Sequence, residues 1–312
     1  MEMILAVVLG LAAPGADTAP ALSADFATGR PADYFTADSA GRVRVASAGK
    51  TQTMILSDGA CQLRDAAVQP GRKYTLTLTA AFEGDAESME DNPRFEVFAR
   101  PGQTSPRLPS RRIEFLDAAG KPTGRPLLHA MPFRNRHTYE DVFYTPAEAA
   151  AVRIGLASGK GVRLILSALR VSETPDEGAL NVNPAFGLGL CNYSGWRNIA
   201  AGGCLIRREG KVVLDTKYGS VGQKIPLSKP GTYALSAKAT GNGYNSVVIV
   251  RVYDRKDKKL MQASTRRYGP RTYFVLPADA AYASFLVYSC LLEEARLVWV
   301  GDEKAIQSLR KK

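Results

Sequence analysis

Histidine and cysteine are scarce in this chain of 312 residues, and helical periodicity is almost absent. Its two histidines and four cysteines include no Cys-x-x-Cys pair, which argues against a zinc site. It contains no Gly-x-Ser-x-Gly elbow, phosphate-binding loop or metal-binding helix motif. His129 and His137 fall in a predicted arginine-rich loop, where we expect solvated side chains. The sequence therefore predicts a protein that is not an enzyme and has no catalytic residues.

No apolar run approaches the roughly 20 residues that a membrane-spanning helix needs. Met3–Ala13 is apolar and is followed by small residues and turn formers, as in an export signal, although Glu2 stands where such signals carry Lys or Arg. We therefore assign residues 1–21 to a signal-like segment and expect a secreted or cell-envelope protein. A buried strand or helix is the alternative interpretation of this segment.

Export would permit disulfide bonds, and three of the four cysteines lie in the second half of the chain. Spacing alone does not choose between a bond of Cys191 to Cys204, a bond of Cys191 to Cys290, and buried free thiols. Cys61 stands alone in the first half.

The net charge is +11, and it is unevenly distributed. Residues 176–312 hold 21 Lys and Arg against 11 Asp and Glu. A positive field favours anionic partners such as acidic polysaccharide, cell-wall polymer or nucleic acid, and solubility alone is the alternative. Nucleic acid is the weaker interpretation, because basic and aromatic residues interleave only loosely, around Arg266–Tyr273.

Two parts of the chain share one pattern of strands and turns. Gln69–Ala80 and Lys229–Ala237 both begin with a Pro-Gly turn and continue with period-two alternation, which predicts a strand with one buried face. Glu114–Lys121 and Arg251–Lys258 are both strand ends that run into a polar turn. Short strands at this spacing predict an all-β protein of two tandem antiparallel jelly-roll β-sandwiches.

The predicted sandwiches cover residues 22–174 and 178–303, and the polar segment Ser172–Gly178 joins them. The first is the more divergent copy and has an insertion near residues 83–112. A basic tail follows at residues 304–312.

The second copy resembles a carbohydrate-binding module of the family four/nine type, which is a galactose-binding-like jelly roll. The segments that carry the resemblance are Leu180–Phe186, Gly195 with Trp196, Pro230–Ala237 and Tyr273–Pro277. The resemblance implies a polysaccharide or cell-wall glycan as partner, and structural calcium in some members. Gly187 stands where the family often has Glu, and Glu293 with Glu294 replaces its usual Asp pair, so we predict no cofactor.

Strand alternation also predicts a ligand-binding face in the second copy, because residues between buried apolar positions point outward. The members of this single aromatic and basic face are Tyr253, Tyr273, Tyr288, Arg251, Arg271 and Lys238. Tyrosine rings stack on the C–H side of a sugar, and arginines bond carboxylate or sulfate groups. Trp196 and Trp299 are predicted to be core residues.

These patterns together predict an exported, non-catalytic glycan-binding protein whose second sandwich binds an anionic polysaccharide. Two alternatives stay open. One is a structural or adhesive protein whose sandwiches contact another surface protein, and the other is an accessory module of a glycoside hydrolase system.

Overall fold

The computed structural model describes most of the chain outside its two ends. The described residues are 21–48, 51–86, 88, 107–174, 179–187, 196–200, 204–216, 220–227, 229–240, 247–265 and 272–301. The signal-like segment up to residue 20, the second half of the linker (residues 175–178), most of the insertion and the basic tail lie outside the described residues.

The described residues form antiparallel strands almost throughout, which confirms the predicted all-β class. The helices among them are α1 (Pro31–Tyr34) and α2 (Ala37–Ala40), and at four residues each neither is long enough to cross a membrane. The jelly-roll topology of two sandwiches stays a prediction.

Strands from the first half of the chain form two sheets. The first sheet has the order β2 (Val43–Ala48), β3 (Thr51–Ser57), β11 (Val162–Glu173), β6 (Lys73–Gly84) and β9 (His137–Tyr144), with β1 (Leu22–Asp25) also paired to β11. The second sheet has the order β4 (Ala60–Gln62), β10 (Ala151–Ala157), β7 (Ser110–Leu116) and β8 (Pro122–Ala130), with β5 (Ala66–Ala67) also paired to β10.

Strands from the second half form two more sheets. The third sheet has the order β12 (Arg197–Ala200), β15 (Ser220–Pro226), β20 (Tyr282–Tyr288), β17 (Val247–Tyr253) and β18 (Lys259–Thr265). The fourth sheet has the order β13 (Cys204–Arg208), β14 (Lys211–Asp215), β21 (Leu291–Gly301), β16 (Thr232–Thr240) and β19 (Thr272–Val275).

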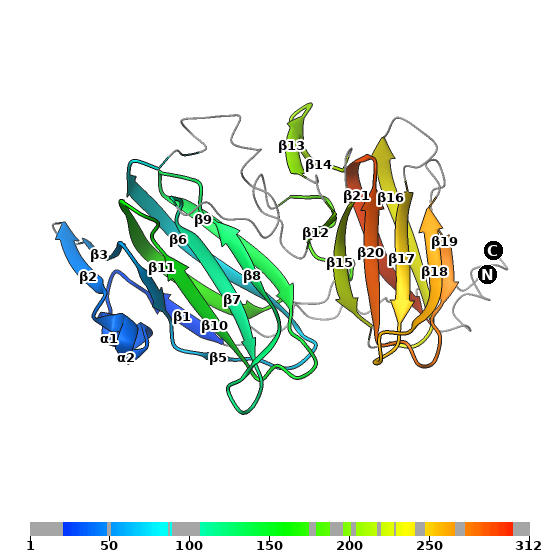
Figure 1. Cartoon of the computed structure of the whole chain (residues 1–312), viewed down its shortest axis with the longest axis horizontal. Coiled ribbons are helices and arrows are strands. Elements are labelled where there is room, and N and C mark those ends of the chain that lie inside the picture. The colour runs from blue at the N-terminus through cyan, green and yellow to red at the C-terminus, as the bar shows by residue number, and fades with distance from the viewer. Residues whose placement is uncertain are drawn as a thin grey trace, which may run out of the picture.

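Each half has its own main hydrophobic cluster. Leu76 of the first sheet and Ile154 of the second belong to one cluster, so these sheets face each other. Phe285 of the third sheet and Leu235 of the fourth belong to another. Figure 1 shows β1 to β11 on one side of the molecule and β15 to β21 on the other. The residues of each cluster therefore come from one half of the chain, and so do the strands that pair with one another.

The two halves repeat a contact at the strand that follows each Pro-Gly turn. Tyr74 on β6 is directly opposite Phe143 on β9, and their rings stack with centroids 6.3 Å apart. Tyr233 on β16 is directly opposite Phe274 on β19, and those rings stack at 5.9 Å. Period-two alternation places all four rings on the core side of their sheets.

The polar turns of the two halves also match. Asp117 accepts hydrogen bonds from the backbone N–H groups of Ala119 and Lys121, each at 2.9 Å. Asp254 accepts the equivalent bonds from Lys256 at 2.8 Å and Lys258 at 2.9 Å. The same spacing in sequence therefore produces the same aspartate-stabilised turn between β7 and β8 and between β17 and β18.

Cys61 and Cys290 are buried free thiols. Burial raises the pKa of Cys61 to about 12 and that of Cys290 to about 11, so both stay protonated at neutral pH. A bond of Cys191 to Cys290 is therefore wrong, whereas a bond of Cys191 to Cys204 stays an open alternative, because Cys191 lies outside the described residues.

Candidate functional site

The outer face of the third sheet carries a compact group of polar and aromatic side chains. Val250 and Val252 of β17 point into the core, so Arg251 and Tyr253 point outward. On β20, Phe285 points inward and leaves Tyr282 and Ser284 on the outer face. Register places Tyr253 directly opposite Tyr282, and Arg251 directly opposite Ser284.

Tyr253 and Tyr282 form a stacked pair with ring centroids 5.0 Å apart and an interplanar angle of 12°. The ammonium of Lys224, on β15, lies 3.7 Å from the centroid of the Tyr282 ring. Because β20 lies between β15 and β17, Lys224 and Tyr253 cover opposite faces of the Tyr282 ring. Both faces of the Tyr282 ring are therefore occupied, so Tyr253 is the member of the pair on which a ligand can stack.

The Tyr282 ring is held in place from a third direction by the turn between β17 and β18. Its hydroxyl donates a hydrogen bond of 2.6 Å to a carboxylate oxygen of Asp257. Burial, together with this bond and the negative charge of Asp257, raises the pKa of Tyr282 well above its usual value. The tyrosine pair is thus preorganised, with Tyr282 as support for Tyr253.

A row of polar side chains crosses the third sheet next to the tyrosine pair. Lys224 is directly opposite Ser284, which is directly opposite Arg251, which is directly opposite Gln262 on β18. Arg251 donates through Nε to Oε1 of Gln262 at 3.2 Å. This row supplies donors and acceptors beside an aromatic ring, which is the combination that a polar ring-shaped ligand requires.

The predicted single binding face is wrong as a unit, because its residues divide between two sheets. Tyr253, Arg251 and Tyr288 lie on the third sheet, with Tyr288 at the far end of β20 from Tyr282. Tyr273 and Lys238 lie on β19 and β16 of the fourth sheet. Alternation gives the side of a strand that a residue occupies but not the sheet to which the strand belongs. Arg271 lies outside the described residues.

Lys238 borders two adjoining hollows on the fourth sheet, of about 240 and 420 Å³. Its ammonium forms an ion pair of 2.7 Å with Glu293, and Lys211 lies 3.9 Å from the same carboxylate. The Lys238 hydrogen bond, with the charges of the two lysines, outweighs burial and lowers the pKa of Glu293. Lys238 is thus already neutralised by a neighbour.

The two tryptophans differ in burial. Trp196 is a core residue, as predicted, and its Nε1 donates to the carbonyl of Asn183 at 3.2 Å. The core prediction for Trp299 is wrong, because this side chain is 37% exposed. Its Nε1 donates to the carbonyl of Pro230, and the ammonium of Lys229 lies 5.0 Å from the centre of its ring. The apolar residues next to Trp299 in sequence suggested burial. The side chain lies near the end of β21, however, beside the Pro-Gly turn that contains Pro230.

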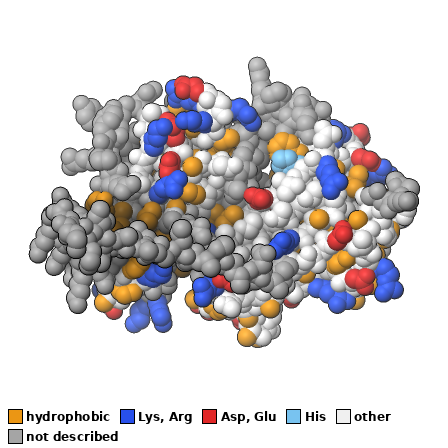
Figure 2. Space-filling view, turned by 180° about the vertical axis from the view of Figure 1, so that it is seen from behind, with side chains coloured by type: hydrophobic (Ala, Val, Ile, Leu, Met, Phe, Trp, Pro, Cys, Tyr) orange, Lys and Arg blue, Asp and Glu red, His pale blue; other side chains and the backbone are white. Residues whose placement is uncertain are grey.

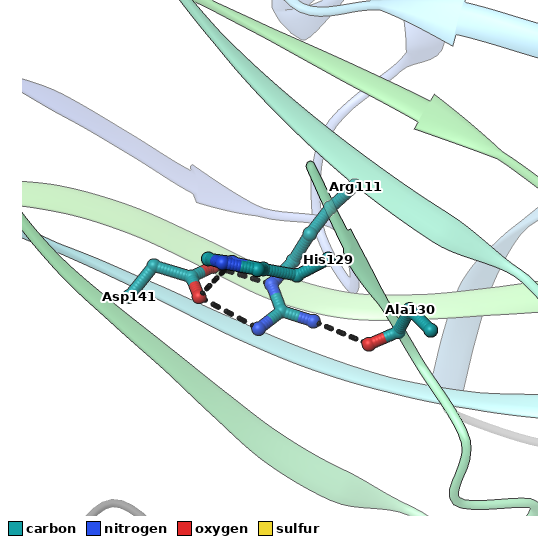
Figure 3. A network of polar contacts seen from close by, with 4 residues as sticks. All are labelled: Arg111, His129, Ala130 and Asp141. Atoms are coloured by element: carbon teal, nitrogen blue, oxygen red, sulfur yellow. Dashed lines mark hydrogen bonds and ion pairs between the residues drawn. The ribbon is translucent and has the colours of Figure 1, made fainter. Parts of the chain in front are cut away.

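A second polar cluster lies inside the first half, between its two sheets (Figure 3). Asp141 of the first sheet receives hydrogen bonds from Nε and Nη2 of Arg111, the latter at 2.7 Å, and lies 2.7 Å from Nδ1 of His129. Arg111 also donates to the carbonyl of Ala130 at 2.9 Å. The expectation of a solvated loop is therefore wrong for His129, which lies on β8 and is 8% exposed.

Burial alone would raise the pKa of Asp141, because a fully buried carboxylate loses its hydration. The charges of Arg111 and His129 and the hydrogen bonds from both outweigh burial and hold the pKa of Asp141 well below its usual value. Arg111 is 2% exposed and Asp141 is fully buried, so these two groups connect the sheets rather than contact a ligand.

Tyr282, Lys224 and Ser284 belong to the outer-face group of the third sheet but were not among the predicted site residues. Period-two alternation from Phe285 turns Ser284 outward, and extending the strand by one residue would have turned Tyr282 outward as well. No local signal places β15 beside β20, so Lys224 could not be found from sequence.

No family model matches this chain, and no curated protein matches it in sequence. Solved structures that resemble it are largely carbohydrate-binding modules. The tandem CBM22-1–CBM22-2 domain of Paenibacillus barcinonensis Xyn10C is 11% identical, at a TM-score of 0.32, with 90% of this chain and 98% of that chain covered. A family 16 carbohydrate-binding module is 15% identical, at 0.29, with 42% and 86% covered.

The enzymatically active domain of tailspike protein 4 from bacteriophage CBA120 is 15% identical, at a TM-score of 0.31. The match covers 42% of this chain and only 18% of that chain. Identities and TM-scores this low establish neither a family nor a ligand for this chain.

Proposed function

We propose that this chain is an exported, non-catalytic protein that binds a glycan through the outer face of the third sheet. The observation that carries the proposal is the Tyr253–Tyr282 pair beside the polar row of Lys224, Ser284 and Arg251. An aromatic ring removes the C–H face of a sugar from water, while neighbouring polar groups bond its hydroxyls. The motif resemblance of the second copy to carbohydrate-binding modules supports the same function.

Binding to a panel of neutral and acidic glycans tests the proposal, with Tyr253→Ala and Tyr273→Ala as a matched pair. Both variants remove a tyrosine ring from the outside of a sheet, but on different sheets. We expect Tyr253→Ala to weaken glycan binding about tenfold or more, because a buried aromatic contact dominates small interfaces. Tyr273→Ala should leave binding unchanged.

Two outcomes contradict the proposal. If the intact chain binds no glycan on the panel, the function is wrong. If binding survives Tyr253→Ala and is lost with Tyr273→Ala, a glycan binds but the third sheet is not its site.

One observation favours protein contact as a second candidate function. Tyr273 and Val275 of the edge strand β19 are 56% and 52% exposed. Exposed apolar side chains on an edge strand are typical of surfaces that another protein covers. This function would be favoured if the intact chain binds no glycan and its mass in solution increases with concentration. Tyr273→Ser and Val275→Ser should then abolish that increase.

A further inference from the structure

We propose that the glycan is acidic, and that Lys224, Ser284 and Arg251 form a subsite for the carboxylate of a uronic acid. This inference rests on the glycan binding proposed above for the same face. We call these three residues the cation notch. They belong to β15, β20 and β17, three neighbouring strands of the third sheet.

Register gives the notch its shape. Ser284 is directly opposite Lys224 on one side and Arg251 on the other. Neighbouring strands lie about 4.8 Å apart, so the backbones of the two cationic residues are about 10 Å apart. The short side chain of Ser284 therefore lies between two long cationic side chains on the same face of the sheet. A small anionic group bound over Ser284 would contact both cations.

The positive charge of the notch is not neutralised by its described surroundings. Neither Lys224 nor Arg251 forms an ion pair with a described carboxylate. The nearby carboxylates have other partners, because Asp254 accepts from backbone N–H groups and Asp257 accepts from Tyr282. Figure 2, the view from behind that of Figure 1, shows Lys and Arg interspersed with Asp and Glu on that face.

The first half provides an internal comparison at the equivalent row of the second sheet. Arg153 on β10 and Glu114 on β7 are directly opposite each other, as Ser284 and Arg251 are in the third sheet. There the charges are compensated: Arg153 pairs with Asp65 at 2.8 Å, and Arg112 pairs with Glu114 at 2.6 Å. Only the second half therefore leaves two cations of this row available for a ligand among the described residues.

The orientation of Arg251 favours a planar anion. Its Nε is used by Gln262, which leaves the two terminal amino groups of the guanidinium for a ligand. Their parallel N–H groups match the two oxygens of a carboxylate, whereas the ammonium of Lys224 acts as a compact point charge. Tyr253 lies in the next row of the same face, where a pyranose ring would stack on it. A uronic acid combines the carboxylate and the ring.

Calorimetric titration of the full chain with polygalacturonate and with its fully methyl-esterified form tests the inference, because the two polymers differ only at the carboxyl group, which is an anion in the first and a neutral methyl ester in the second. At low salt we expect polygalacturonate to bind about tenfold more tightly than the ester. Dextran sulfate serves as a third polymer that carries charge without a carboxylate.

Variants then assign the effect to the notch. We expect Lys224→Gln and Arg251→Gln each to weaken polygalacturonate binding about tenfold and to leave binding of the ester unchanged. Arg251→Lys keeps the positive charge but lacks the parallel N–H groups of a guanidinium, so it should also weaken binding. Lys211→Gln makes the same change of charge on the fourth sheet and should have no effect. Circular dichroism checks that each variant is folded.

Four outcomes overturn the inference. If the acid and the ester bind equally well, the inference is wrong but the glycan function stands. The same holds if dextran sulfate binds more tightly than polygalacturonate and Arg251→Lys does not weaken that binding. Polygalacturonate binding that Lys211→Gln weakens as much as Lys224→Gln does would indicate general charge attraction. Failure to bind either pectin polymer overturns it as well, and the wider glycan panel then decides whether the proposed function also fails.

Discussion

At the scale of single residues, the carboxylate of Asp141 is tightly constrained by its neighbours. It is fully buried and is bound by Arg111 and His129 from the opposing sheet. Taking such charges out of water costs several kcal/mol for each ion, and their attraction offsets this cost only while both partners are present. The cluster is therefore sensitive to the loss of one member.

We predict that Asp141→Asn lowers the free energy of unfolding at pH 7 by about 3–5 kcal/mol, because it leaves Arg111 buried without its counter-ion. Urea denaturation followed by circular dichroism measures the change. Asp65→Asn is the control, since it breaks an Arg–Asp pair whose side chains are 29% and 36% exposed. This control should change stability by less than about 1 kcal/mol. Equal losses for the two variants would contradict the prediction.

The difference in stability between the natural chain and Asp141→Asn should also depend on pH. The pKa of Asp141 is lower in the folded protein than its ordinary value of 3.8, so its contribution to stability is complete above that value and is lost as pH falls through the folded pKa. The difference in stability between the natural chain and Asp141→Asn should therefore be larger at pH 7 than below about pH 4. A difference that grows in acid would show that Asp141 is not held in its charged form.

At the scale of elements, the end of the β6–β11 pair depends on a close backbone approach. Gly84 has a φ of +127°, and a Cβ at this position would collide with the carbonyl oxygen of Gly161. Only glycine combines this backbone conformation with this contact. Gly120, in the turn between β7 and β8, also has a positive φ, +76°, but open space around it.

We predict that Gly84→Ala destabilises the chain by at least about 2 kcal/mol more than Gly120→Ala, because it adds a steric collision to the same kind of backbone strain. Thermal unfolding of the two variants measures the difference. Similar unfolding temperatures would mean that the ends of β6 and β11 separate at little cost.

Strand β20 shows how one element serves both the core and the face. Phe285 and Val287 belong to the hydrophobic cluster of the second half, while Tyr282 and Ser284 point to the proposed glycan site. Alternation along this single strand therefore couples the position of the notch to the packing beneath it. A rigid strand in the middle of a sheet holds a binding group more firmly than a loop does.

At the scale of the whole molecule, the two main hydrophobic clusters share no residue, and no described strand pairs across the middle of the chain. We predict two unfolding transitions in calorimetry. Leu76→Ala should lower one transition and Phe285→Ala the other, because removal of a fully buried side chain costs about 2–5 kcal/mol within its own cluster. A single transition that both variants lower equally would contradict the division into two units.

The sequence by itself determined the all-β class, the inward and outward residues of β16, β17 and β20, and the aspartate turns. These features depend on alternation and on turn chemistry, which are local. The segments around Tyr74 and Tyr233 make equivalent contacts, while the tandem repeat and its jelly-roll topology stay predictions.

Tertiary structure decided which strands are neighbours, and the site depends on that. Tyr253 and Tyr273 both point outward from their strands, yet β17 and β19 belong to different sheets. Lys224 meets Tyr282 only because β15 pairs with β20, about 60 residues further along the chain. Asp141 finds Arg111 and His129 only because two sheets face each other. Such pairings follow from the burial of a whole core, which no short stretch of sequence encodes.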